Sequence, residues 1–359
     1  MHIPLKKNSM KYSIFMLFLW GFFSCSCNEN TTRCGLVDFS QVTTLVVEDS
    51  IDLEALDILN PHYIFHKDSF LIFNSIQGRK EIQLLNLSNS QVHEFNVIGQ
   101  GPNEMINYQS VINGNDGNYM FADISKGKIY EISLDSLKNN DKTNYNLKLS
   151  LPNQQGYFLL RYIDLPDYII GIGMLNEKRL WVYNKKTSTV KEQIEYPENE
   201  LISPLSSMHK GALFSRTLLA SNKDGNKLAV ASFGLIDFLD LPKDGNLMLT
   251  KSNHYHFPLF NVGDIGGPAI VNKKEDKAGI IGLCSDDDYV YGLYSNKTID
   301  EYGIEGAYHA SFILVWDWDG NPIKSFWLSM PLYGFSISGD IIYGLSRIKE
   351  PKVYTFRIK

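Results

Sequence analysis

Short runs of β-branched and aromatic residues, separated by turns rich in Asn, Asp, Gly and Pro, cover most of this chain. One type of strand recurs six times after a polar turn, and its copies have as anchors Phe70, Tyr119, Tyr168, Leu228, Tyr289 and Ile341. The steps between these anchors are 49, 49, 60, 61 and 52 residues, and a second strand follows each anchor. Short strands at such regular spacing predict an all-β fold built from repeated antiparallel units.

The number and size of these units predict a six-bladed β-propeller. One small sheet cannot bury both of its faces alone, so each unit must pack against its neighbours around a ring. The last unit ends with the strand at residues 353–358 and lacks an outermost strand. We therefore expect an N-terminal strand at residues 43–47 to complete the last blade, which closes the ring and removes an exposed sheet edge.

The first 27 residues follow a different pattern. Basic residues precede an apolar run at residues 12–23, and small residues and then a polar stretch follow that run. The run is too short to cross a bilayer core of ~30 Å as a helix. This order of basic, apolar and small residues is typical of a secretory signal peptide.

A cysteine directly after the apolar run resembles the bacterial lipobox, in which the cysteine is acylated and becomes the first residue of the mature protein. We predict acylation of Cys25, with Cys27 as the alternative. The predicted organisation is a lipoprotein signal peptide at residues 1–24, a tether at 25–40 and a single six-bladed propeller domain at 41–359. A signal peptide that is cleaved without lipidation is the other interpretation of the same pattern.

Charge and cysteine content narrow the class of partner. The formal net charge is −6 and residues of both signs are interspersed. The sequence therefore lacks the basic patch that a nucleic-acid partner would require. The two remaining cysteines, Cys34 and Cys284, are far apart in the sequence and lack metal-binding spacing. Cys284 lies in an apolar run and is predicted to be a buried thiol. A Cys34–Cys284 disulfide, which an oxidising compartment would permit, is the alternative.

Residue patterns that would indicate a catalytic, metal-binding or phosphate-binding site are weak. The chain has no Gly-x-Ser-x-Gly nucleophile elbow, so we predict no catalytic residue and no cofactor. His254 and His256 would share one face of a strand, which makes them weak candidates for metal ligands, but no third ligand accompanies them, so no metal site is predicted. The glycine-rich segment at 99–104 and the acidic segment at 286–288 are interpreted as turns, because they lack the residues of a phosphate-binding loop and of a calcium loop.

The segment at 295–309 is the most informative candidate for a binding site. It joins two strands of the fifth unit and is much longer than its counterparts, and long loops in compact folds are commonly functional. In a propeller, connections between the second and third strands emerge on the same face as connections between blades. We therefore predict a binding rim around the channel mouth that contains Tyr302, Tyr308, His309 and Glu104, with aromatic anchors of the kind enriched at binding hot spots.

Five segments together resemble the six-bladed, TolB-like propeller lipoproteins of Gram-negative envelopes. They are the lipobox-like start and residues 97–104 (VIGQGPNE), 286–294 (DDDYVYGLY), 315–322 (VWDWDGNP) and 342–345 (IYGL). The resemblance implies the propeller fold and a place in the cell envelope, with the chain held by its lipid at the outer membrane, on the periplasmic or the surface side. It implies no defined reaction.

The pattern of residues favours a noncatalytic binding or scaffolding module. Its expected partner is an envelope protein or a glycan, and its expected membrane contact is the N-terminal lipid. The alternative is an enzyme, either a hydrolase or a lyase, that acts on a polysaccharide or a lactone in the central funnel of the propeller. Fold resemblance alone does not decide between them, because function depends on the site.

Overall fold

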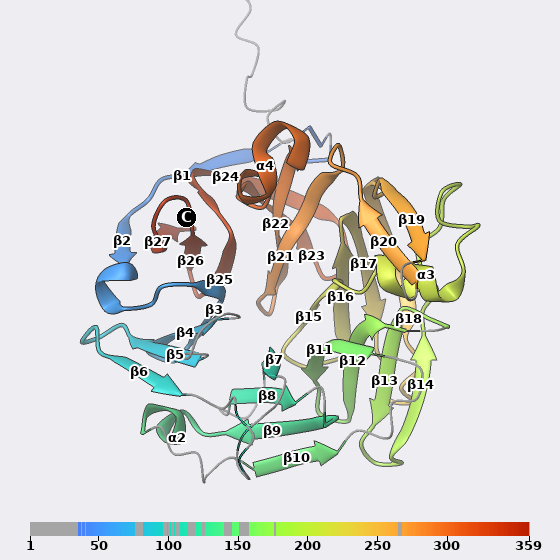
Figure 1. Cartoon of the computed structure of the whole chain (residues 1–359), viewed down its shortest axis with the longest axis horizontal. Coiled ribbons are helices and arrows are strands. Elements are labelled where there is room, and N and C mark those ends of the chain that lie inside the picture. The colour runs from blue at the N-terminus through green and yellow to red at the C-terminus, as the bar shows by residue number, and fades with distance from the viewer. Residues whose placement is uncertain are drawn as a thin grey trace, which may run out of the picture.

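The computed structural model is a ring of six antiparallel sheets around a central channel (Figure 1). It describes residues 35–36, 38–39, 41–75, 82–95, 99, 101, 104, 108–113, 119–123, 126–139, 146–150, 158–175, 177–264 and 268–358. The prediction of an all-β, six-bladed propeller is confirmed. Among the described residues, none of the helices combines the length and the apolar character that crossing a membrane requires.

The first three blades each have four strands, which follow in chain order from the channel outward. Blade one contains β3 (Pro61–Lys67), β4 (Phe70–Ser75), β5 (Ile82–Asn86) and β6 (Val92–Phe95). Blade two contains β7 (Tyr108–Asn113), β8 (Tyr119–Asp123), β9 (Lys128–Ile132) and β10 (Asn146–Ser150). Blade three contains β11 (Phe158–Asp164), β12 (Tyr168–Met174), β13 (Leu180–Asn184) and β14 (Thr189–Gln193).

The other three blades follow the same plan. Blade four contains β15 (Leu218–Ser221), β16 (Lys227–Ser232), β17 (Gly234–Asp240) and β18 (Met248–His256). Blade five contains β21 (Lys277–Ser285), β22 (Tyr289–Thr298), β23 (Ala310–Asp317) and β24 (Pro322–Leu332). Blade six contains β25 (Gly334–Ser338), β26 (Ile341–Ser346) and β27 (Lys352–Arg357).

Two N-terminal strands join the ends of the chain. An N-terminal strand completes the last blade as predicted, but that strand is β2 (Asp49–Asp52), which pairs antiparallel with β27. The prediction that residues 43–47 would do so is wrong, because β1 (Val42–Leu45) instead adds a fifth, parallel strand to blade five through β24. The β-branched residues of β1 made it the stronger strand signal, whereas the exposed outer strand β2 needs few apolar side chains.

The anchor strands are apolar on both faces because each blade lies between two others. In β4, Phe70 and Ile72 belong to the hydrophobic cluster shared with blade two, whereas Leu71 and Phe73 belong to the cluster shared with blade six. Every junction between neighbouring blades contains such a cluster. Side chains alternate along a strand, so a continuous apolar run supplies both junctions.

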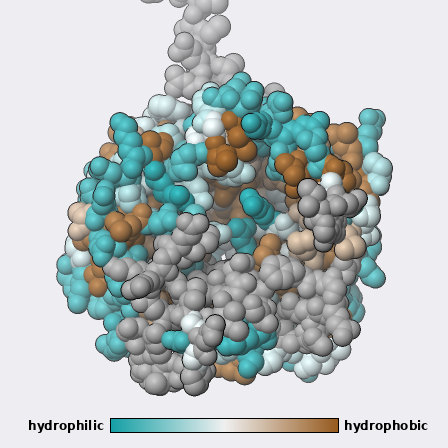
Figure 2. All heavy atoms as spheres, in the orientation of Figure 1, coloured by the Kyte–Doolittle hydropathy of each residue, from teal (hydrophilic) through white to brown (hydrophobic). Residues whose placement is uncertain are grey.

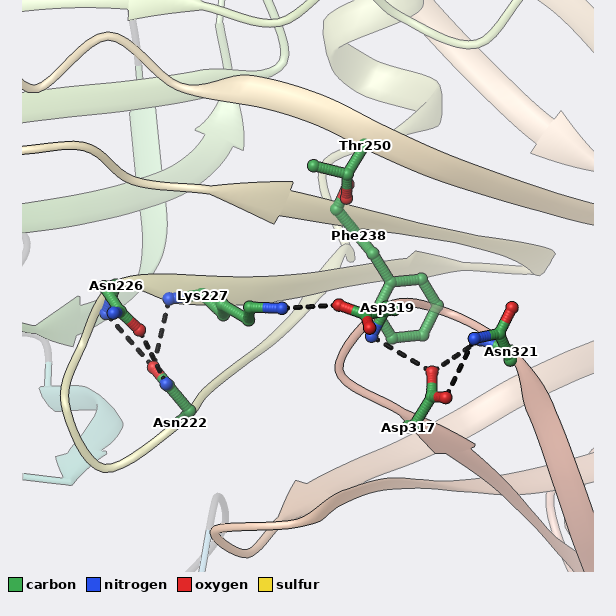
Figure 3. A network of polar contacts seen from close by, with 8 residues as sticks. All are labelled: Asn222, Asn226, Lys227, Phe238, Thr250, Asp317, Asp319 and Asn321. Carbon is green, nitrogen blue, oxygen red and sulfur yellow. Dashed lines mark hydrogen bonds and ion pairs between the residues drawn. The ribbon is translucent and has the colours of Figure 1, made fainter.

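The Asp-Gly-Asn turn between β23 and β24 fastens blade five to blade four (Figure 3). Asp317 Oδ1 accepts hydrogen bonds from the backbone N–H groups of Asp319 (3.0 Å) and Asn321 (2.8 Å). Lys227 Nζ of blade four lies 2.6 Å from Asp319 Oδ1. Gly320 has φ +78°, and a Cβ there would come within 2.7 Å of the Phe238 ring, so glycine is required for this close approach.

Three insertions lie on the opposite face of the ring, which we call the α4 face. They are α3 (Ser207–Leu213) before β15, the hairpin of β19 (Phe260–Asp264) and β20 (Pro268–Asn272) before β21, and α4 (Ile299–Ala307) between β22 and β23 (Figure 1). Connections between blades and between second and third strands leave the same ends of an antiparallel sheet, so all three insertions reach one face. The remaining helices are η1 (Glu54–Leu56) and α2 (Leu134–Lys138).

Candidate binding site at the channel mouth

Polar side chains from blades one, three, five and six converge where the channel opens on the α4 face. Tyr333 immediately precedes inner strand β25, and Arg347 follows β26. We use the term mouth cluster for six residues, which are His62, Tyr63, Arg161, Glu305, Tyr333 and Arg347. Figure 2 shows that this face is hollowed near its centre and that hydrophilic residues are visible in the hollow.

Arg347 is held flat against an aromatic ring at the edge of the mouth. Its guanidinium carbon lies 4.6 Å from the centroid of the Tyr333 ring, and its Nη1 lies 3.2 Å from His62 Nδ1. The nearest carboxylate oxygen, Glu305 Oε1, is 3.9 Å from Arg347 Nε, which is too long for a hydrogen bond. The Arg347 side chain is therefore oriented by neutral groups more than by the carboxylate.

His62 is neutral in this arrangement. A guanidinium has no acceptor, so the contact with Arg347 requires Nδ1 of His62 to be the unprotonated nitrogen. The Tyr333 hydroxyl lies 3.3 Å from the same nitrogen. Burial lowers the pKa of His62 below its usual 6.5, and the charge of Arg347 lowers it further, whereas Glu305 opposes both.

Arg161 reaches the mouth from blade three. Its Nη2 donates to the Tyr63 hydroxyl of blade one at 3.1 Å, and its Nη1 donates to the carbonyls of Thr217 (3.0 Å) and Arg216 (3.4 Å). Among the residues that the structure describes, no carboxylate oxygen lies within 4.0 Å of this guanidinium. The pKa of Tyr333, on the Arg347 side of the cluster, is raised mainly by burial.

The segment at 295–309 is a helical insertion fixed by a buried histidine. The Thr298 side chain caps α4 by accepting from the Glu301 N–H group, and Gly303 has a φ of 68° at a kink inside the helix. His309 Nδ1 donates to the Glu305 carbonyl at 2.6 Å, and its Nε2 accepts from the Arg347 N–H group at 3.1 Å. His309 thus ties α4 to blade six.

The predicted rim residues differ in their position. Tyr302 is 54% exposed on α4, and Lys297 Nζ lies 5.4 Å from its ring centroid. Tyr308 is half-buried. His309 is fully buried and lies beneath the rim, so its imidazole positions the insertion and is not an exposed anchor. Glu104 folds back on its own loop, where its Oε2 accepts from the Gly101 N–H group at 2.8 Å.

The expectation that His254 and His256 share one face of a strand is wrong. A β-bulge at Tyr255 shifts the register, so that His256 pairs with Gly234 and His254 pairs with Leu235. The partners Gly234 and Leu235 are adjacent in their strand and point to opposite faces, so the two histidines do as well. His254 Nε2 lies 3.4 Å from Asp237 Oδ1, and His256 packs beside Tyr294 of blade five (ring centroids 6.3 Å apart). Within the described part of the chain, no group of three or more His, Cys, Asp or Glu side chains is placed to hold a metal.

The cysteine and aspartate predictions have different outcomes. Cys25, Cys27 and Cys34 lie outside the described residues. The Cys284 sulfur donates to the Phe335 carbonyl at 3.2 Å, and burial raises the pKa of this free thiol to about 12. Asp286 accepts from the N–H groups of Asp288 (2.9 Å) and Tyr289 (2.7 Å), and its two following aspartates are exposed, as expected of a turn.

A second polar cluster between blades three and four had no sequence signal. Arg179 is fully buried, forms an ion pair with Asp237 and donates to the Ser232 hydroxyl at 3.1 Å. Beside this pair lies a pocket of about 390 Å³ whose lining includes His254, Tyr196 and Leu249. A lone arginine before an apolar strand is ordinarily a surface residue. Only the packing of the two blades shows that Arg179 is an internal one.

Comparison with known proteins gives the following relations. The model of a family described as TolB-like 6-blade propeller-like matches residues 38–340. A comparison with curated protein sequences found no match. Among solved structures, a member of the DUF4221 family from Bacteroides vulgatus is 12% identical with a TM-score of 0.53, and the alignment covers 88% of this chain and 97% of that one.

Two further solved structures are similar at lower TM-scores. A luciferin-regenerating enzyme is 10% identical with a TM-score of 0.49, over 86% of this chain and 95% of that chain. The hydrazine synthase of Kuenenia stuttgartiensis is 10% identical with a TM-score of 0.44, over 84% of this chain and 96% of that chain. Identities this low describe the fold alone and transfer no activity.

Proposed function

The chain belongs to the TolB-like six-bladed propeller family, and we propose that it is a noncatalytic binding module that engages an envelope protein or a glycan at its channel mouth. The observation that carries this proposal is the mouth cluster, where two arginines are held in place and no carboxylate of the described residues lies at hydrogen-bond distance from them. The insertion α4 borders this cluster and offers exposed Tyr302 and Ile304 (69% exposed) to a partner. Aromatic and arginine side chains are the residues enriched at binding hot spots.

The imidazoles at the mouth support binding more than catalysis. A general base needs a nitrogen that can reach a substrate proton. Both ring nitrogens of His309 are engaged by backbone groups, and Nδ1 of His62 faces Arg347 and Tyr333. Glu305, the carboxylate of the mouth cluster, is more than half exposed on α4 and has no second carboxylate beside it within the cluster. The alternative of a hydrolase or lyase in the funnel receives no specific support from these contacts.

The proposed site of action is the cell envelope, where an acyl chain on Cys25, or on Cys27, would hold the propeller at the outer membrane. The support is the order of basic, apolar and small residues at the start of the chain. Each buried CH₂ group of an acyl chain contributes about 0.8 kcal/mol to membrane binding. Radiolabelled fatty acid should label the wild-type chain and not Cys25→Ala. Labelling that persists in that variant and is lost in Cys27→Ala would move the anchor to Cys27.

The test of the binding function is capture of a partner from envelope extracts by the purified mature chain. The variant Tyr302→Ala/Ile304→Ala should lose the captured partner, because it removes the exposed contact area of α4 and leaves the core unchanged. Ile323→Ala is the matched control, since Ile323 is also an exposed apolar residue and lies beside the β23–β24 turn on the opposite face. Capture of the same partner by all three chains would contradict a role for the α4 face.

A further inference from the structure

We infer that the mouth cluster is an oxyanion site, in which Arg161 and Arg347 bind carboxylate or phosphate oxygens of the ligand. This inference rests on the proposed function, because it names the chemical group that a partner would insert into the channel mouth. It concerns residues that the sequence patterns did not single out. The evidence is the charge balance at the mouth, the orientation of the two arginines and the position of Glu305.

The mouth is locally positive on an acidic protein. The chain has 34 basic and 40 acidic residues, which give the net charge of −6. Among the described residues of the mouth, however, Arg161, Arg347 and Lys297 have Glu305 as their nearest carboxylate. Within the described part of the chain, Arg161 and Lys297 have no carboxylate oxygen within 4.0 Å, and Arg347 reaches Glu305 only at 3.9 Å. Lys297 donates instead to the His309 carbonyl at 2.8 Å.

Two half-buried lysines of blades two and three have carboxylate partners. Lys148 lies 3.1 Å from Asp164 and 3.2 Å from Glu131, and Lys185 lies 2.6 Å from Asp164. Unpaired cations are costly in a partly desolvated site, because burial penalises their charge. Among the described residues, Arg161 and Arg347 have no carboxylate oxygen at hydrogen-bond distance, unlike Lys148 and Lys185, so their charge is available to an external anion.

The two guanidinium groups are oriented before any ligand arrives. Arg347 lies over the Tyr333 ring, and Arg161 lies 5.7 Å from the Tyr63 ring centroid while donating to two backbone carbonyls. A planar guanidinium held in this way can donate two parallel hydrogen bonds to a carboxylate or a phosphate. The Tyr63 hydroxyl accepts from Arg161 and keeps its own hydrogen as a further donor for a ligand oxygen.

Glu305 acts as a weak internal competitor for the same cations. Its side chain is 57% exposed on α4, and its carboxylate faces Arg347 without reaching hydrogen-bond distance. An incoming oxyanion would be repelled by this charge and attracted by the arginines. Removing the Glu305 charge should consequently strengthen anion binding. A purely structural role of the arginines would give no such gain.

The experiment is isothermal titration calorimetry of the purified mature chain with three probes. The probes are an oligogalacturonate, an uncharged oligosaccharide of the same length and inorganic phosphate. The wild-type chain should bind the oligogalacturonate or phosphate, with an affinity that falls as salt is added, and should not bind the uncharged probe. Binding of only one charged probe identifies the group as a carboxylate or as a phosphate.

Variants separate anion binding from folding. Arg347→Gln should weaken binding by about tenfold or more, since hydrogen bonds to charged groups are the strong ones. Glu305→Gln should bind several times more tightly than the wild type, and this exposed substitution leaves the core intact. Glu301→Gln, on the same exposed helix, is the matched control and should bind as the wild type does.

Three outcomes would overturn the inference. They are no binding of either charged probe, equal binding of the uncharged probe, and affinities that do not change in Arg347→Gln and Glu305→Gln. These results would leave the proposed function standing if Tyr302→Ala/Ile304→Ala still abolished partner capture. If the charged probes did not bind and Tyr302→Ala/Ile304→Ala also captured the partner as the wild type does, the binding function itself would be contradicted.

Discussion

Two arginine clusters on the α4 side of this propeller accommodate the charge of a guanidinium that is removed from water in opposite ways. Arg179 is fully buried between blades three and four and is neutralised by Asp237, with Ser232 as a further hydrogen-bond partner. Arg347 is half-buried between blades five and six, and its neighbours are the Tyr333 ring, the neutral His62 and a distant Glu305. Both guanidinium groups lie over an aromatic ring, since Arg179 lies 5.4 Å from the Phe214 ring centroid.

The difference in burial and in carboxylate distance indicates which cluster stabilises the fold. A buried charge is tolerated only with a close counter-charge, and Asp237 supplies it for Arg179. A half-buried guanidinium keeps part of its hydration and can remain without a counter-charge at the channel mouth. We therefore assign a structural role to Arg179 and a binding role to Arg347 and Arg161. Three changes test this division.

Removing the counter-charge of Arg179 should have the largest effect. Asp237→Ala leaves a buried unpaired guanidinium and should lower the free energy of unfolding by about 3–5 kcal/mol. Urea denaturation measures this loss. The double variant Arg179→Met/Asp237→Leu removes both charges and should recover most of the stability. A stable Asp237→Ala chain would mean that the pair is not needed and that the contrast between the two clusters fails.

Arg347→Gln should change the titration of His62 while costing little stability. The free energy of unfolding should fall by about 1 kcal/mol or less, because the side chain is partly hydrated and has no close counter-charge. The folded-state pKa of His62 lies below 6.5, and loss of the Arg347 charge should raise it. NMR titration of the His62 ring measures this shift, and Glu305→Gln should move the pKa in the opposite direction.

The lowered pKa of His62 has a defined effect on stability. Below about pH 6.5 the unfolded chain takes up a proton at His62 that the folded chain resists, so this residue makes the folded state less stable as the pH falls through that value. The loss stops once the pH passes the folded-state pKa. In Arg347→Gln the loss should be smaller. An unchanged pH dependence in this variant would show that Arg347 does not act on His62.

The exposed ion pair on the opposite face should matter least. Lys227→Ala removes the contact with Asp319 shown in Figure 3, and the free energy of unfolding should fall by no more than about 1 kcal/mol. Asp319→Ala should have a similarly small effect, as measured by urea denaturation. A loss as large as that of Asp237→Ala would show that pairing, and not burial, sets the energetic difference between the clusters.

Much of the fold could be predicted because propeller blades leave a local trace in the sequence. Each anchor strand contains a short apolar run, as in Phe70–Phe73, since its two faces serve two blade junctions. Turn residues such as Gly320 mark the hairpins between strands. The closing strand was misplaced because β2 lies at an exposed edge and contains one apolar residue, Ile51, so its side chains give little signal.

The candidate site was predictable only in part. The length of the segment at 295–309 correctly indicated an insertion beside the mouth, but nothing local indicated that His309 would be buried beneath it. The positions of His254 and His256 depended on a bulge at Tyr255, which no residue pattern marked. Arg161 and Tyr63 are separated by about a quarter of the chain, and only the closed ring brings them to 3.1 Å.

The amino-acid sequence by itself determined the strand repeat, the number of blades and the face on which the insertion at 295–309 lies. These properties depend on side-chain alternation and on turns between neighbouring residues, which are local. The tertiary structure alone decided which N-terminal strand closes the ring, which histidines are buried and which arginines have a carboxylate at hydrogen-bond distance. Those properties depend on contacts between blades, and burial and charge balance exist only once the ring has closed.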